Sequence, residues 1–100
     1  MLPCYQETNV SIYHGNALDV LGELPEESAH CCITSPPYWG LRNYGIEPSL
    51  WPDGWTGCHG LEQTVEQYVA HEVDIFRAVR RVLRSDGTLW LNLGDTYMGS

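Results

Sequence analysis

The segment with the clearest chemical potential is Thr34-Ser35-Pro36-Pro37-Tyr38-Trp39, which follows a short apolar run. Proline has no backbone N–H to donate, so two prolines end a strand and leave its last carbonyls without partners in the sheet. The Ser35 hydroxyl and the Pro36 carbonyl can then accept the two N–H groups of an amine on a heteroaromatic ring, while Tyr38 offers a face on which the ring stacks. Such an arrangement directs the lone pair of the amine at an electrophile. The segment therefore suits methylation of an exocyclic amine by direct displacement.

The hydrophobic patterns around this segment predict an α/β fold. Strands are expected at 10–14, 29–34 and 88–93, and helices at 17–24 and about 64–84. Strands separated by helices favour right-handed crossovers and a largely parallel sheet with flanking helices. Ligands bind such sheets outside the carboxyl ends of the strands. The candidate site residues at strand ends are Gly15-Asn16, Ser35 to Tyr38, and Gly94-Asp95.

Capping signals and apolar spacing define the two predicted helices. Asn16 is a good N-cap for the first helix. Thr64 and Gln67 form a capping box for the second helix, and Gly87 can supply its stop. An apolar stripe at spacings of three and four is predicted to face the core and consists of Val65, Val69, Val73, Phe76, Val79 and Leu83. The arginines near the end of this helix suit its dipole and are interpreted as a solvated face.

Residues 39–63 form a long segment that is rich in Trp, Gly and Pro and has no periodicity. Loops longer than about 12–15 residues inside a compact domain are usually functional or disordered. The aromatic residues of this segment include Trp39, Trp51 and Trp55, which argue against disorder. A functional loop is therefore predicted.

The composition limits the classes of protein that fit. The chain has 100 residues, of which 43% are hydrophobic and 18% charged, as in one small globular domain or a piece of a larger one. Its 13 acidic and 5 basic residues give a net charge of −8, which argues against a free-standing nucleic-acid binder. No apolar run reaches the roughly 20 residues of a membrane span, and the N-terminus does not resemble a signal peptide. No membrane partner is expected.

The cysteines and histidines indicate neither disulfides nor a metal site. Cys4, Cys31, Cys32 and Cys58 lack the spacing of a disulfide framework, so buried thiols in a cytoplasmic protein are expected. A zinc site made of Cys58, His59 and the Cys31-Cys32 pair is conceivable but lacks a C-x-x-C spacing, so no metal is expected. The histidines form no recognisable constellation and are given no role.

Three segments in order resemble the amino-group DNA methyltransferases, in the branch whose catalytic motif comes first. Ser35-Pro36-Pro37-Tyr38 resembles the catalytic motif, residues 14–21 the strand, turn and helix before it, and residues 79–95 the helix, turn and strand after it. The resemblance implies a partial Rossmann-like fold and methyl transfer from S-adenosylmethionine to cytosine N4 or adenine N6. It also implies that double-stranded DNA is the partner, that the target base leaves the duplex, and that the enzyme is bacterial or phage-encoded and cytoplasmic.

The resemblance assigns roles residue by residue. Ser35, Pro36, Pro37 and Tyr38 would be catalytic, Asn16 and Asp95 would contact the cofactor, and Arg42 and Trp39 would contact DNA. The family usually has an acid where Asn16 stands, although the side-chain carbonyl of Asn16 can still accept a hydrogen bond. Plainer roles stay open, namely a helix cap for Asn16, a turn cap for Asp95 and a packing residue for Tyr38. The Trp-rich loop at 39–63 is the candidate for covering the extracted base.

The family's glycine-rich cofactor loop, of the form F-x-G-x-G, does not occur in these 100 residues. Residues 1–100 are therefore expected to be the incomplete N-terminal catalytic part of a methyltransferase domain, which binds S-adenosylmethionine poorly or not at all. Serine before the prolines favours cytosine N4, because the adenine-N6 enzymes of the family more often have aspartate there. The alternatives are an adenine-N6 enzyme and a truncated, inactive remnant or interaction module. Methylation of RNA or of a protein glutamine fits less well, since those relatives more often have Asn before the prolines.

Overall fold

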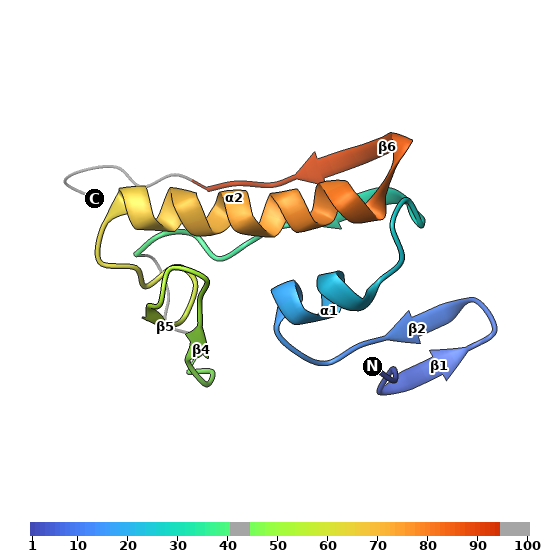
Figure 1. Cartoon of the computed structure of the whole chain (residues 1–100), viewed down its shortest axis with the longest axis horizontal. Helices are drawn as coiled ribbons and strands as arrows, with labels where there is room; N and C mark the ends of the chain where they lie inside the picture. The colour runs from blue at the N-terminus through green and yellow to red at the C-terminus, as the bar shows by residue number, and fades with distance from the viewer. Residues whose placement is uncertain (41–44, 95–100) are drawn as a thin grey trace.

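The computed structural model describes residues 1–40 and 45–94, a mixed α/β arrangement of two helices and three strand pairs (Figure 1). In chain order the elements are β1 (Tyr5–Glu7), β2 (Val10–Ile12), α1 (Ala17–Glu23), β3 (Ala29–Thr34), β4 (Ser49–Leu50), β5 (Thr56–Gly57), α2 (Val65–Val82) and β6 (Leu83–Leu91). β1 pairs with β2 and β4 with β5 in antiparallel fashion, whereas β3 and β6 are parallel. Neither of the two described helices combines the length and the apolar character that crossing a bilayer would need.

The parallel pair β3–β6 joins segments that lie far apart in the sequence. Thr34 is in register with Leu91, and the Asn92 N–H donates to the Thr34 carbonyl at 3.0 Å. The register of the ladder shifts between Ala29 and Cys31. α2 runs alongside the two strands in Figure 1 and leads directly into β6. Both strands therefore end at the same edge, next to the residues that the sequence nominates for chemistry.

The strand predicted at 10–14 does not join this parallel pair. Val10–Ile12 instead pairs with Tyr5–Glu7, and every residue of both strands is exposed. Segments that are close in sequence pair with little loss of chain entropy, so a local hairpin satisfies these backbone groups without reaching a core. Within the described ranges, the predicted largely parallel sheet is therefore represented by β3 and β6.

β3 is not the fully buried central strand that its apolar run predicts. Ile33 is 81% exposed, and its register partner Trp90 is 66% exposed. β3 has one strand neighbour among residues 1–40 and 45–94, so one of its edges and part of its surface stay open.

The expected burial of the thiols is also wrong. All the cysteines are free, with Cys4 and Cys31 exposed and Cys32 and Cys58 partly buried.

α2 begins where the capping residues predict and ends earlier than expected. The Gln67 N–H donates to Thr64 Oγ1 at 3.1 Å, which confirms the N-cap. Gln67 Oε1 accepts from the N–H of Gln63 at 3.3 Å, one residue before the group that a capping box would use. Leu83 has extended backbone angles and enters the ladder with β3, so Gly87 lies inside β6 and is not the helix stop.

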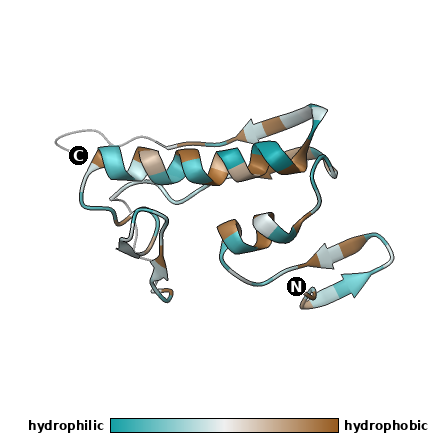
Figure 2. Ribbon diagram, in the orientation of Figure 1, coloured by the Kyte–Doolittle hydropathy of each residue, from teal (hydrophilic) through white to brown (hydrophobic). Residues whose placement is uncertain are grey.

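The buried face of α2 differs from the predicted stripe. The exposed members of that stripe are Val65, Val69 and Val73. The buried residues of the helix are His71, Val79 and Val82, and Trp51 stacks on His71 from the loop. Hydrophobic and hydrophilic residues alternate along the helix in Figure 2. The prediction therefore holds for Val79 at the C-terminal end of the helix and fails for the three N-terminal valines, because a polar side chain, His71, occupies the face that packs there.

Arg81 on α2 holds α1 through backbone carbonyls. Asn16 caps α1 as predicted, with its Oδ1 accepting from the Leu18 N–H at 2.9 Å. The Arg81 guanidinium donates to the carbonyls of Leu21 and Leu24, each at 2.6 Å. Carbonyls at the end of a helix have no partner within it, so one charged side chain satisfies two such groups.

We expect Arg81→Met to lower the free energy of unfolding by about 1.5–3 kcal/mol, the range for hydrogen bonds to a charged group. Methionine keeps an apolar stem but leaves both α1 carbonyls without their donor. Arg80→Met is the matched control, because Arg80 lies exposed on the same helix. Urea unfolding followed by tryptophan fluorescence measures both variants, and equal midpoints would contradict the role given to Arg81.

Candidate functional site

The Ser-Pro-Pro-Tyr segment lies where the two parallel strands end. It follows Thr34, the last residue of β3, and the Tyr38 ring lies against Gly94 just beyond β6. A Cβ at Gly94 would come within 2.5 Å of the Tyr38 ring, so only glycine leaves room for the ring there. Ser35 is exposed and Pro36 is buried. The structure thus brings together two of the strand ends that the sequence nominates.

The acceptor atoms of the segment differ in their partners. Within residues 1–40 and 45–94, no group donates to the Ser35 hydroxyl or to the Pro36 carbonyl. The Pro37 carbonyl, in contrast, accepts a hydrogen bond from the Tyr68 hydroxyl at 2.8 Å. Burial raises the pKa of Tyr68, so its hydroxyl remains a donor at neutral pH. Among the described residues, both acceptors that the sequence assigns to an amine are therefore without a donor.

Asn16 and Pro37 line the same pocket, whose volume is about 580 Å³. Its other lining residues include Trp51, His59 and Ile75. Small-molecule sites usually have volumes of about 300–1,000 Å³, so a small ligand fits in size. One lone pair of the Asn16 side-chain carbonyl is used by the α1 cap, and a carbonyl oxygen has a second. The pocket connects the predicted cofactor residue Asn16 with the predicted catalytic segment.

The remaining predicted site residues lie elsewhere. Arg42 and Asp95 fall outside the described residues. Trp39 donates its indole N–H to the Glu62 carbonyl at 2.9 Å, so its polar atom is used within the loop. Trp51 is buried, and its indole N–H donates to the Gly57 carbonyl at 3.1 Å. Contact of Trp39 with DNA stays a prediction.

Part of the loop predicted at 39–63 has regular structure. β4 and β5 pair across a turn in which the Gly54 N–H donates to the Trp51 carbonyl at 2.9 Å. Gly54 has a φ of 89°, a backbone conformation that favours glycine. The hairpin places Trp51 and Trp55 over His71, with ring centroids 4.3 and 5.5 Å away. The loop is therefore built on an aromatic and histidine core.

Two histidines that were given no role from the sequence form the most polar part of that core. Glu62 Oε2 lies 2.7 Å from Nδ1 of both His59 and His71. The second ring nitrogen of His59 contacts Glu72 at 2.5 Å, and that of His71 contacts Asp53 at 2.7 Å. These five side chains form one line in the order Asp53, His71, Glu62, His59, Glu72, called here the Glu62 network.

Burial and charge set the protonation of the Glu62 network. His71 is 0% exposed and Glu62 is 4% exposed. Burial alone would lower the pKa of His59, but hydrogen bonds to Glu72 and Glu62 outweigh it and raise that pKa. Burial alone would raise the pKa of Glu62, but hydrogen bonds from His71 and His59 outweigh it and lower that pKa. His59 lies between two carboxylates, so the geometry calls for a donor at both of its ring nitrogens.

The Glu62 network was missed because its members come from a loop and from two positions on a helix. The sequence did contain one signal. His71 precedes Ile75 by four residues and Val79 by eight, which places the three on one face of α2. A histidine on the packing face of a helix needs partners for its ring nitrogens, and Glu62 and Asp53 are those partners.

The network also contains donor atoms that a metal ion could use. Ligand atoms of His59, Glu62 and His71 all lie within 4.8 Å of one another. The zinc candidate considered from the sequence is not this set, which includes His59 but no cysteine. Nδ1 of both histidines already faces one carboxylate oxygen, Glu62 Oε2, at 2.7 Å, and each second ring nitrogen faces another carboxylate oxygen at 2.5–2.7 Å. The observed geometry is that of a hydrogen-bond network.

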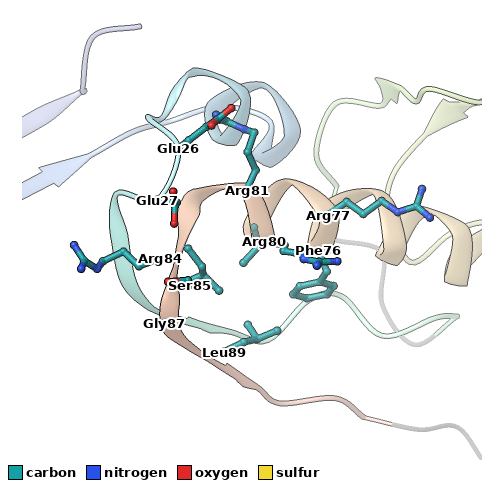
Figure 3. A pocket seen from close by; sticks show the side chains of 12 residues that line it. Glu26, Glu27, Phe76, Arg77, Arg80, Arg81, Arg84, Ser85, Gly87 and Leu89 are labelled. Carbon is teal, nitrogen blue, oxygen red and sulfur yellow. The ribbon is translucent and has the colours of Figure 1, made fainter.

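A further cavity lies at the other end of β6 from the motif. It has a volume of about 850 Å³, and Figure 3 shows Arg77, Arg80 and Arg84 around it together with Glu26 and Glu27. Ligands of parallel sheets bind at the carboxyl ends of strands, whereas this cavity is at the start of β6. These three arginines are exposed, as the solvated face expected from the sequence requires, whereas Arg81 of the same set is half-buried because it binds backbone carbonyls near the end of α1.

A mixed α/β fold with a Ser-Pro-Pro-Tyr segment at the end of a parallel strand is the combination expected of an amino-group methyltransferase. Comparison with known proteins leads to the same class. Residues 29–100 match the sequence model of the N6/N4 methyltransferases, described as DNA methylase. The chain belongs to this DNA methylase family.

The relatives of the chain include several type II methyltransferases. M.XycI of Xanthomonas campestris pv. cyanopsidis is 51% identical over 87 residues, which is 87% of this chain and 26% of that protein. M.Cfr9I of Citrobacter freundii is 46% identical over 87 residues, which again is 87% of this chain and 26% of that protein. M.SmaI of Serratia marcescens is 47% identical over 83% of this chain and 25% of its own length. The chain thus spans about a quarter of these relatives. No solved structure matches it significantly.

The pKa directions in the Glu62 network predict a pH optimum of stability. The raised pKa of His59 stabilises the fold at pH below the ordinary value of 6.5, and this stabilisation is lost as pH rises through the folded-state pKa. The lowered pKa of Glu62 stabilises it above the ordinary value of 4.5, and this is lost as pH falls through the folded-state pKa. Both contributions are complete between about pH 4.5 and 6.5, so the network stabilises the fold most there.

Urea titrations at a series of pH values measure this effect. His59→Gln should flatten the decline on the alkaline side, because glutamine does not titrate. His30→Gln is the control, since His30 is exposed on β3 outside the network. An alkaline decline that is the same in both variants would show that His59 does not cause it.

Proposed function

We propose that the chain carries the catalytic part of a site-specific DNA methyltransferase. The reaction is transfer of a methyl group from S-adenosylmethionine to an exocyclic base amine, with cytosine N4 favoured over adenine N6. The observation that carries the proposal is the Ser-Pro-Pro-Tyr segment at the carboxyl end of β3, with Tyr38 packed on Gly94 beyond β6. Membership of the DNA methylase family supports it.

The chemistry follows from the acceptors of the segment. The Ser35 hydroxyl and the Pro36 carbonyl accept the two N–H groups of the amine, and Tyr38 stacks on the base. Fixing both N–H groups turns the nitrogen lone pair out of conjugation with the ring and toward the methyl donor. The methyl donor would supply the carbon and leave as a thioether with the electron pair of its broken S–C bond, while the amine nitrogen would lose one N–H proton through the Ser35 hydroxyl to water. No covalent bond to the protein is needed.

The pocket lined by Asn16 and Pro37 fits one side of a cofactor site. Its volume of about 580 Å³ suits a small ligand, and Asn16 supplies a carbonyl acceptor beside the motif. S-adenosylmethionine, when bound, supplies the methyl group. Asn16 and Asp95 would contact it, while the F-x-G-x-G loop is not among these 100 residues. On this proposal residues 1–100 are the N-terminal catalytic part of a Rossmann-like methyltransferase domain.

DNA is the proposed substrate although the chain is acidic. A base inside a duplex is out of reach of the motif, so it must be extracted, which costs a few kcal/mol in lost stacking. With a net charge of −8, these 100 residues cannot supply most of the phosphate contacts. Arg42 and Trp39 are proposed as local DNA contacts. The basic surface then lies in parts of the enzyme that correspond to the rest of its longer relatives.

A chimera tests the proposal. In it, this chain replaces the matching segment of M.XycI, so that the remaining three-quarters of a relative is present. We expect Ser35→Ala and Tyr38→Ala each to lower the single-turnover rate of methyl transfer to DNA by at least about tenfold, because each removes a group that orients the amine. Incorporation of a labelled methyl group measures the rate, and nucleoside mass spectrometry identifies the methylated base.

The matched controls are Ser85→Ala and Tyr5→Ala, since both residues are exposed and lie away from the motif. N4-methylcytosine is the expected product, whereas N6-methyladenine would establish the alternative base. Rates that stay unchanged in both motif variants would overturn the catalytic assignment.

A further inference from the structure

Glu62 is connected to the segment that follows the motif by two short paths. Its carbonyl accepts the indole N–H of Trp39 at 2.9 Å. Its Oε1 accepts the N–H of Gly60 at 2.7 Å, and the Gly60 carbonyl in turn accepts the N–H of Gly40 at 2.7 Å. Gly60 has a φ of 96°, and a Cβ there would lie only 3.1 Å from Cβ of Pro37. Glu62 therefore holds the two residues directly after the motif, Trp39 through its carbonyl and Gly40 by way of Gly60.

Tyr68 provides a third connection, from α2. Its ring is nearly parallel to that of His59, with centroids 4.9 Å apart and an interplanar angle of 8°. Its hydroxyl donates to the Pro37 carbonyl at 2.8 Å. The residues on both sides of Tyr38 are thus held by partners of the network, while the ring of Tyr38 itself packs on Gly94.

Aromatic rings shield His71 of the network from water. Trp51 is buried and stacks on His71 with an interplanar angle of 19°, and Trp55 stacks on the same imidazole. Hydrogen bonds between charged groups are stronger in such an interior than in water, and they are directional. A cluster of this kind fixes orientations more closely than apolar packing does.

We propose that the Glu62 network positions the Ser-Pro-Pro-Tyr segment for methyl transfer. Glu62, His59 and His71 act as positioning residues through the chain on either side of Tyr38, and His59 also lines the pocket proposed for the cofactor. The inference rests on the proposed function and adds the residues that hold its catalytic segment. Buried ion clusters contribute little net stability compared with apolar cores, so their effect here lies in geometry. A misplacement of about 1 Å can cost on the order of a hundredfold in rate.

The first experiment examines the chain itself and needs no activity. Glu62→Gln replaces the carboxylate that contacts both imidazoles with an amide of the same shape. We expect the NMR signals of the Tyr38 ring, assigned with Tyr38→Phe, to shift in this variant. Glu66→Gln is the matched control, because Glu66 is exposed in the first turn of α2 and makes the same chemical change outside the network.

The second experiment measures kinetics in the M.XycI chimera. Glu62→Gln should lower kcat by about 10- to 100-fold, with the KM for S-adenosylmethionine unchanged within about twofold. Tyr68→Phe removes only the hydroxyl that holds the Pro37 carbonyl and keeps the ring. We expect it to lower kcat by about three- to tenfold, the effect of one neutral hydrogen bond. Glu66→Gln should match the unsubstituted chimera.

Each outcome decides one question. If Glu62→Gln does not fold, Tyr68→Phe still tests the inference, because it leaves the network in place. Unchanged kcat per folded molecule in Tyr68→Phe, with unshifted Tyr38 signals, would overturn the positioning role. Stoichiometric zinc or another transition metal in the purified chain would overturn it as well, by making the cluster a metal site.

A chimera that methylates no DNA would count against the proposed function, whereas the Tyr38 signals of the chain would still report on positioning.

Discussion

A carboxylate buried away from water must find donors, and this requirement of Glu62 organises the region between the motif and α2. Its two oxygens accept from His59, from His71 and from the backbone of Gly60. Meeting that requirement draws the loop onto the helix and places a ring on each side of the carboxylate. Trp51 and Trp55 of the loop stack on His71 and exclude water from it, which strengthens the same hydrogen bonds.

The parallel pairing of β3 with β6 supplies the other half of the arrangement. It brings the end of one strand beside the end of another strand about 57 residues later, since Thr34 is in register with Leu91 (91 − 34 = 57). α2 spans much of this separation and carries Tyr68, which reaches back to the Pro37 carbonyl. The same helix that connects the strands therefore also holds the residue next to Tyr38. Fold and site are built from one set of elements.

The charge of the chain has a consistent meaning in this setting. A net charge of −8 is unsuited to DNA if these residues form the whole binding surface, but the chain spans about a quarter of its relatives. Part of the acidic charge has an internal use, because the Glu62 network contains Glu62, Glu72 and Asp53 around two imidazoles. The remaining acidic residues do not identify a partner. Composition describes the solvent-facing surface better than it describes the ligand.

Features that depend on residues close together in the sequence could be predicted from the sequence alone. The caps Asn16 and Thr64, the run of β3 and the Ser-Pro-Pro-Tyr segment are local features, and the family follows from them. The tertiary structure decided what depends on distant partners. It turned residues 10–12 into a local hairpin, exposed the first three valines of the predicted stripe and gathered His59 and His71 on Glu62. Capping uses atoms within a few residues, so spacing reveals it. Burial and protonation depend on which charges and rings meet in space, and only the folded chain determines that.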